Sequence, residues 1–144
     1  MIATYETDVV AWANEQARLI RAGRFDLLDI EHVAEEIEDV GKSEQRELAN
    51  RMAVLLAHLL KWQHQPERQG NSWQNTIRAQ RKEVAYLLDE APSLRGKLVE
   101  PRWLDMVWAK AVAQAGDETG LDDWPATMPW LVPEILAEDW LPKI

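Results

Sequence analysis

The sequence has no cysteine, and its 144 residues include only one phenylalanine and two tyrosines. Without thiols the chain cannot form a disulfide, a thiolate metal site or an iron–sulfur cluster, and it has no cysteine nucleophile. It also lacks an apolar run near the ~20 residues that a membrane-spanning helix needs. The first eight residues have neither the basic region nor the apolar stretch of a signal peptide. These absences predict a cytoplasmic protein.

Several enzyme signatures are missing as well. The sequence contains no Gly-x-Gly-x-x-Gly, no phosphate-binding Walker loop and no Gly-x-Ser-x-Gly. We therefore expect no nucleotide cofactor, and no cofactor of another kind is indicated.

Positive charge is scarce, with 16 Lys and Arg against 25 Asp and Glu, for a net charge of −9. This balance disfavours binding to nucleic acid, and we expect no such partner from charge alone. The average hides an alternation, because residues 26–50 carry −7, residues 51–102 carry +4 and residues 103–144 carry −6. Such segments either neutralise one another on folding or form a polarised surface that recognises a charged partner.

Strand signals are absent, whereas apolar residues recur at helical spacing along most of the chain. We predict an all-α fold in a single domain over residues 1–144, with a helical bundle over residues 5–116 and a wrapping tail over residues 117–144. The bundle has four main helices, one of them long, at about residues 30–64.

The first helix is expected from about residue 7 or 8 to Ala22, before Gly23. Its inward stripe consists of Val9, Trp12, Gln16, Leu19 and Ile20.

The long second helix has an inward stripe that starts with Ile30, Val33, Ile37 and Val40 and continues through Leu48, Met52, Leu55, Leu59 and Trp62. The helical phase survives across Gly41, which favours one helix. A kink at Gly41 is the alternative, since glycine is a poor residue for a helix interior.

Asn71 or Ser72 is expected to cap the third helix, which is expected to expose Arg78, Arg81 and Lys82. The fourth is expected over about residues 94–115, kinked or restarted at Pro101 and stopped by Gly116. The remaining residues are rich in Pro and Trp, and a short helix fits residues 133–138. We expect this tail to bury its Trp rings on the bundle. An exposed pair among Trp103, Trp124 and Trp130 would instead mark a partner surface.

A metal site would need His and carboxylate ligands. His32, Glu35 and Glu36 share a helix face, and His58 is a further candidate. A two-metal carboxylate bundle needs a Glu-x-x-His motif on each of two helices. This chain has a single motif in the reversed order, His-x-x-Glu, at His32 and Glu35. We therefore expect no metal and interpret this segment as a solvated acidic face.

Arg51 and His58 lie seven residues apart, on one face of the long helix. The spacing resembles the Arg-x6-His motif of helical ribonucleases of the higher-eukaryote-and-prokaryote nucleotide-binding class. In that chemistry His58 would move a proton and Arg51 would hold the phosphate. Met52 stands where the motif has a polar residue. The alternative places His58 against the core and pairs Arg51 with Glu47.

A longer resemblance is carried by residues 34–48, by the string from His58 to Pro66, and by residues 72–78 and 92–95. Over about residues 5–142 the chain resembles the bacterial family called domain of unknown function 29. The resemblance implies an all-helical bacterial protein with no established activity, cofactor or substrate. It emphasises His58, Lys61, Trp62 and the acidic pair Glu35 and Glu36.

We predict a non-enzymatic module that binds another protein through a charged or Trp-bearing face, as a monomer or a homodimer. Its candidate binding residues are Lys61, Trp62, Glu35, Glu36, Arg78 and Arg81. One alternative is a phosphodiester-cleaving enzyme that uses His58 and Arg51. Another is a metal-dependent hydrolase that uses His32, Glu35, Glu36 and His58.

Overall fold

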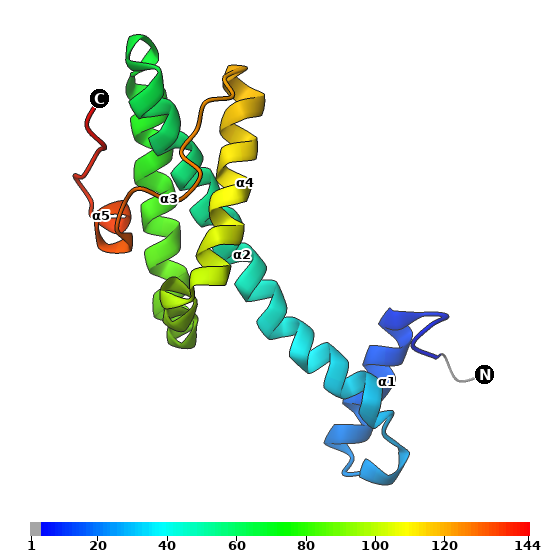
Figure 1. Ribbon diagram of the computed structural model, residues 1–144. Coiled ribbons are helices and arrows are strands. Elements are labelled where there is room, and N and C mark those ends of the chain that lie inside the picture. The colour runs from blue at the N-terminus through cyan, green and yellow to red at the C-terminus, as the bar shows by residue number, and fades with distance from the viewer. Residues whose placement is uncertain (1–3) are drawn as a thin grey trace. The chain divides into compact units, whose positions relative to one another are not determined.

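The computed structural model describes residues 4–144 as an all-α chain. Its α-helices, labelled in Figure 1, are α1 (Val9–Arg21), α2 (Ile30–His64), α3 (Asn71–Glu90), α4 (Pro101–Thr119) and α5 (Val132–Leu136). Short 3-10 segments lie between them at Phe25–Leu27, Pro66–Arg68 and Pro92–Val99. No strand occurs in residues 4–144, which confirms the predicted fold class. None of the helices described is both long and apolar enough to cross a membrane.

By its internal contacts the chain divides into two compact units, Met1–Ser43 and Glu44–Ile144. We call them the N-terminal unit and the C-terminal unit. Helix α2 contributes residues to both. The prediction of a single domain over residues 1–144 stays a prediction.

The N-terminal unit is a pair of antiparallel helices, α1 and the start of α2. Asp8 caps α1, because its carboxylate accepts a hydrogen bond from the backbone N–H of Ala11 at 3.0 Å. Contacts along this pair run in opposite chain directions: Gln16 of α1 meets Asp29 just before α2, whereas Tyr5 just before α1 meets Glu36 of α2. The connection between the helices therefore folds α1 back along α2.

Helix α2 continues across Gly41 without interruption, as predicted. Asp29 precedes the helix, and its backbone carbonyl oxygen accepts a hydrogen bond from the N–H of Val33, with 2.9 Å between oxygen and nitrogen. The helix ends at His64, just before Gln65 and Pro66, because proline disfavours helical backbone angles in the residue that precedes it.

The core of the C-terminal unit is built from the second half of α2, from α3 and from α4, which lie alongside one another (Figure 1). Leu55, Leu56, Leu59 and Leu60 on α2 are fully buried. At about 100° per residue they fall within one broad arc of the helix, so that face of α2 is buried, whereas Arg51, Val54 and His58 on the other face are only partly buried.

Helix α4 differs from the expectation at both ends. It starts at Pro101, because residues 92–99 form a 3-10 segment and proline fits the first turn of a helix. It runs through Gly116 and ends before Gly120, whose φ of 75° gives the left-handed cap that glycine favours. The prediction that Gly116 ends the helix is wrong, since Gly116 keeps helical geometry.

The tail of residues 121–144 packs on the C-terminal unit, and its short helix α5 lies at Val132–Leu136. Trp130 and Ile135 are buried in the core. Trp130 packs edge-on against Trp108 of α4 at 5.8 Å between ring centres. Trp103, expected off the inward stripe, is also buried. These rings therefore belong to the core and do not form an exposed pair.

Candidate functional site

Polar groups of the C-terminal unit meet at Lys61 of α2, whose side chain is only 8% exposed. Its ammonium forms a hydrogen-bonded ion pair with the carboxylate of Glu118 on α4. The same Nζ lies 3.5 Å from Nε2 of His58 and 5.3 Å from the ring centre of Trp73 on α3. A buried ammonium is tolerated only where such partners replace its hydration. Lys61 thus connects α2, α3 and α4.

The imidazole of His58 is held between its own helix and Lys61. Its Nδ1 lies 2.9 Å from the carbonyl oxygen of Val54. A ring nitrogen that contacts a carbonyl oxygen carries the proton, so Nε2 of the neutral ring is an acceptor that faces Lys61. Burial, and then the nearby ammonium of Lys61, lower the pKa of His58 despite its bond to Val54. The ring is therefore neutral at pH 7.

Glu118 lies at the edge of this cluster, with 41% of its side chain exposed. Gln114 donates a hydrogen bond to its Oε1 at 3.0 Å. Partial burial by itself raises the pKa of Glu118, but the hydrogen bonds from Lys61 and Gln114 outweigh it and lower the pKa below its ordinary value. Both charges of the pair are already engaged, which favours a structural link between the helices.

Arg51 has a different partner from His58. Its Nε donates to Glu47 at 2.9 Å, one helical turn away, and the side chain is partly exposed. This is the pairing that the non-catalytic interpretation of the Arg-x6-His spacing expects. The ring nitrogens of His58 instead contact Val54 and Lys61. A catalytic role for His58 and Arg51 stays a prediction.

The predicted binding residues Trp62 and Arg78 are placed differently in the C-terminal unit. Trp62 is partly buried and packs against the core. Arg78 is exposed on α3 and donates to the side-chain oxygen of Asn75 at 3.3 Å. Arg78 is therefore available to a partner, whereas most of the Trp62 ring is used in packing.

Arg81 was expected on the exposed side of α3, and this expectation is wrong because the tail covers it. Its guanidinium donates to the backbone carbonyls of Ile135 at 2.8 Å, Glu138 at 3.0 Å and Trp140 at 2.6 Å. One of these hydrogen bonds is buried and two are partly buried, and the fork of donors on one arginine supplies all three. Arg81 therefore binds the tail to α3.

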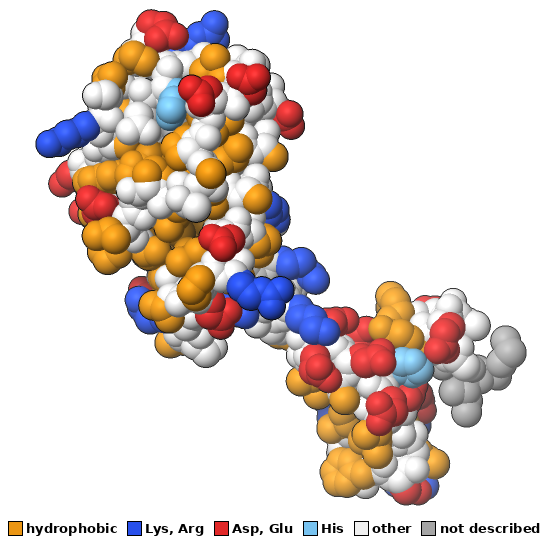
Figure 2. All heavy atoms as spheres, in the orientation of Figure 1, with side chains coloured by type: hydrophobic (Ala, Val, Ile, Leu, Met, Phe, Trp, Pro, Cys, Tyr) orange, Lys and Arg blue, Asp and Glu red, His pale blue; other side chains and the backbone are white. Residues whose placement is uncertain are grey.

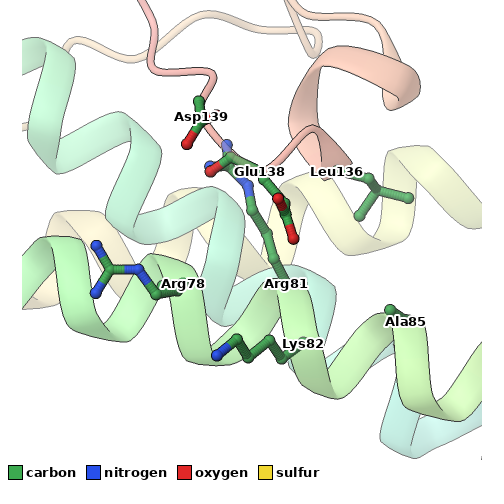
Figure 3. A pocket seen from close by; sticks show the side chains of 7 residues that line it. All are labelled: Arg78, Arg81, Lys82, Ala85, Leu136, Glu138 and Asp139. Atoms are coloured by element: carbon green, nitrogen blue, oxygen red, sulfur yellow. The ribbon is translucent and has the colours of Figure 1, made fainter.

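A pocket of about 330 Å³ lies beside Arg81 (Figure 3). Arg78 and Lys82 line it from α3, and Glu138 and Asp139 line it from the tail. Figure 3 shows the Arg81 side chain reaching from α3 toward the tail, between these groups. The lining carries both signs of charge, so it favours neither an anion nor a cation.

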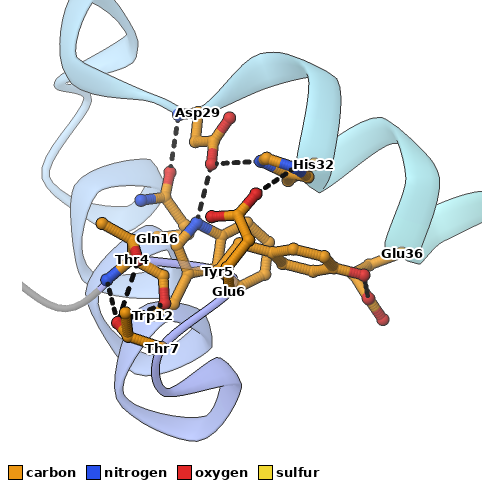
Figure 4. A network of polar contacts seen from close by, with 9 residues as sticks. All are labelled: Thr4, Tyr5, Glu6, Thr7, Trp12, Gln16, Asp29, His32 and Glu36. Carbon is orange, nitrogen blue, oxygen red and sulfur yellow. Dashed lines mark hydrogen bonds and ion pairs between the residues drawn. The ribbon is translucent and has the colours of Figure 1, made fainter.

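A second polar network belongs to the N-terminal unit (Figure 4). Asp29 accepts hydrogen bonds from the indole N–H of Trp12 at 3.0 Å and contacts Nδ1 of His32 at 2.7 Å. The ring of Tyr5 stacks on His32 with 4.2 Å between centres, and its hydroxyl donates to Glu36 at 2.5 Å. These contacts hold α1 and the segment before it against α2.

This network shifts the titration of its members. The hydrogen bond that His32 donates to the carboxylate of Asp29 raises the pKa of His32 and lowers the pKa of Asp29. The carboxylate of Glu36 raises the pKa of Tyr5 to about 12. Charged Asp29 and protonated His32 therefore stabilise each other.

The metal-ligand candidates are not brought together. His32 uses Nδ1 for Asp29, and Glu36 accepts from Tyr5. His58 belongs to the C-terminal unit. Within residues 4–144 no group of three or more His, Asp or Glu side chains is arranged to hold a metal ion.

The N-terminal unit exposes residues that the helical stripes place inward. Of fourteen exposed large hydrophobic side chains in residues 4–144, eight lie in this unit, namely Val9, Val10, Ile20, Phe25, Leu27, Ile30, Ile37 and Val40. The expectation that Val9, Ile20, Ile30, Ile37 and Val40 face inward is wrong. Two helices provide one contact seam, which covers only part of the apolar surface of each. Figure 2 shows hydrophobic side chains gathered on this unit beside acidic ones.

Several of these exposed residues lie beside the contact seam between the two helices. On α1, Ala13 and Ile20 each come one position after a buried residue, namely Trp12 and Leu19. At α2, Ile30 follows Asp29, which bonds Trp12 of α1, and Ile37 follows Glu36, which bonds Tyr5 just before α1. One position turns a helix by about 100° in a fixed sense, so in an antiparallel pair both rows lie on the same side.

We call this surface the N-terminal apolar face. It is formed by Val9, Ala13 and Ile20 of α1 and by Ile30, Ala34 and Ile37 of α2, all of which are exposed. Exposed apolar side chains that gather on one side of a helix pair are typical of a contact site for another protein.

The fold and these features define an all-α protein whose polar clusters are engaged in internal contacts and whose apolar surface is concentrated on one helix pair. The chain belongs to the family described as Domain of unknown function DUF29, which matches residues 4–141. This confirms the resemblance noted above. Comparison with curated proteins and with solved structures found no match.

Sequence reasoning missed Glu118, which completes the Lys61 cluster, and it missed the N-terminal apolar face. Glu118 is 57 residues from Lys61, and no spacing rule connects residues on different helices. Apolar residues at helical spacing predict the helices. They do not predict which of these residues are buried by packing against another part of the chain.

Proposed function

We propose that this protein is a non-enzymatic interaction module of the bacterial cytoplasm, which docks another protein chain on the N-terminal apolar face. The observation that carries the proposal is the exposure of Ile30 and Ile37, at 65% and 67%, beside Val9 and Ile20 on the same face. Covering these side chains removes apolar area from water at about 25 cal/mol per Å², which drives association.

The polar clusters support the same proposal. Lys61 is paired with Glu118, and Arg51 with Glu47. A general base must reach a substrate proton, whereas Nε2 of His58 faces the ammonium of Lys61. In these clusters the reactive groups are engaged with each other, which favours a contact surface over a hydrolytic site.

Site-specific crosslinking tests the proposal. A photo-crosslinking amino acid at position 37 of the full chain, activated in cells of its natural host, is expected to give one predominant protein adduct. Position 99 is the matched control, since Val99 is 79% exposed in the C-terminal unit. No adduct at position 37 beyond that at position 99 would contradict an interaction module that uses this face.

The hydrolytic alternative has a separate test. If His58 and Arg51 cleave phosphodiesters, the purified chain should cleave single-stranded RNA and His58→Ala should abolish the cleavage while the helical circular dichroism is retained. We expect the two proteins to show equal, background cleavage. RNA cleavage by the wild-type chain that is lost in His58→Ala would favour the phosphodiester-cleaving enzyme.

A further inference from the structure

The N-terminal unit buries very little of itself. Among its described residues only Trp12, Gln16 and Leu19 are buried. Units of about 40 residues or fewer usually need disulfides, a metal or association to be stable. This chain has no cysteine, and the described residues hold no metal-binding cluster. Association with another surface would add stability, and the exposed N-terminal apolar face is a surface on which it can occur.

The charged residues that border this face indicate which partner surface is complementary to it. One position beyond Ile20, at the outer edge of α1, stands Arg21. One position beyond Ile30 and Ile37, at the outer edge of α2, stand Glu31 and Glu38. All three are exposed, and none of them forms an ion pair with any residue from 4 to 144. The face is thus bordered by one basic residue, Arg21, on α1 and by acidic residues on α2.

Two copies of such a face can meet about a two-fold axis in two ways. With the axis across the helices, α2 lies on α2, so Glu31 and Glu38 meet the same acidic residues of the other copy. With the axis along the helices, α1 of one copy lies on α2 of the other, so Arg21 meets Glu31. Like charges in contact are disfavoured and opposite charges are favoured, which selects the second arrangement.

The direction of the side chains agrees with this pairing. Helical side chains lean toward the N-terminus of their helix. Arg21 on α1 and Glu31 on α2 then lean toward each other, because the two helices are antiparallel. Because Gln16 is level with Asp29, Arg21 lies nearer the connection between the helices than Glu31 does, and this leaning reduces the offset between them.

We propose that the N-terminal apolar face binds the same face of a second copy of this chain, as a two-fold four-helix bundle with the Arg21 edge of each copy on the Glu31 edge of the other. This inference rests on the proposed function and names its partner. In this bundle the same face of both copies forms the interface, which buries Ile20, Ile30 and Ile37 of each copy. The four helices then share one core.

Charge reversal tests the arrangement in the full chain. Arg21→Glu places Glu against Glu31 in a homodimer, and Glu31→Arg places Arg against Arg21. Because each contact occurs twice, we expect each variant to weaken the dimer by roughly tenfold in Kd, as measured by sedimentation equilibrium. In an equimolar mixture of the two variants both contacts are attractive, so the mixture should recover heterodimers of near wild-type affinity. Arg102→Glu, an exposed change of equal charge in the C-terminal unit, should leave the Kd unchanged.

Ile37→Asp provides the second arm. Ile37 is exposed, so the variant is expected to keep the circular dichroism of the wild type and to sediment as a monomer. Val99→Asp, at a site 79% exposed in the C-terminal unit, should remain a dimer. A wild-type chain that is monomeric at all concentrations would overturn the second-copy inference, as would a dimer that Ile37→Asp does not affect.

The two proposals fail differently. An adduct at position 37 with a different protein, combined with a monomeric chain, refutes pairing with a second copy but leaves the interaction module intact. A monomeric chain that also gives no adduct at position 37 contradicts both.

Discussion

Arg81 and Trp140 are joined by the shortest of three hydrogen bonds that one guanidinium donates to the tail, at 2.6 Å to the carbonyl oxygen of Trp140. The two residues are 59 positions apart, so this contact closes a long loop of the chain. The tail has only one short helix of its own. Its attachment therefore depends on a donor from α3, together with the burial of Trp130 and Ile135.

Arg81→Met should destabilise the C-terminal unit by about 3 kcal/mol, because it removes one buried and two partly buried hydrogen bonds to carbonyl oxygens while keeping the volume of the side-chain stem. Urea unfolding measures the loss, and limited proteolysis should cut within residues 131–144 first. Arg78→Met, on the exposed side of α3, is the matched control and should change stability by less than about 0.5 kcal/mol. Equal effects of the two variants would show that the tail is held by its apolar contacts alone.

Glu118→Gln should destabilise the chain by about 1–3 kcal/mol, because it leaves the buried ammonium of Lys61 without a countercharge. The exposure of Glu118 places the expected value at the lower end of this range. The double variant Lys61→Met with Glu118→Gln should recover part of the loss, since it removes the uncompensated charge. Thermal unfolding of the three proteins checks the order, and a double variant less stable than Glu118→Gln would contradict the assignment.

The pair of Asp29 and His32 makes the N-terminal unit sensitive to pH. Because the pKa of His32 is raised on folding, its stabilisation is complete below its ordinary value of 6.5 and is lost as the pH rises through the folded value. Because the pKa of Asp29 is lowered, its stabilisation is present above its ordinary value of 3.8 and is lost as the pH falls through the folded value. The pair should therefore stabilise the unit most between these two ordinary values.

Urea unfolding followed through the indole N–H signal of Trp12 should show this unit to be more stable at pH 5.5 than at pH 8.5. The difference should shrink in Asp29→Asn, which keeps an acceptor for Trp12 and removes the charge that His32 needs. A difference of the same size in both proteins would assign the pH dependence to other groups.

Gly41→Ala should stabilise α2 by up to about 1 kcal/mol, because alanine is the better helix former and an added Cβ meets no atom within 4 Å. Gly23→Ala is the contrasting change, since Gly23 has a φ of 72° and alanine is strained there. Thermal unfolding should therefore move in opposite directions for the two variants. A destabilising Gly41→Ala would mean that α2 bends at this residue.

The sequence by itself determined the helical class, the long helix over residues 30–64, and the positions of most helix ends. These features rest on local physics, namely the spacing of apolar residues, the capping of α1 by Asp8 and the effect of Pro66 on the residue before it. The family resemblance likewise depends on the order of residues alone.

Tertiary structure decided the rest, because it depends on which surfaces meet. An apolar stripe shows that a helix face should be covered, but only the fold shows that Leu59 is covered and Ile37 is not. Arg81 reads as exposed from the period of α3, yet the carbonyl groups of the tail bury it. Lys61 finds Glu118 on another helix, a distance in sequence over which periodicity carries no information.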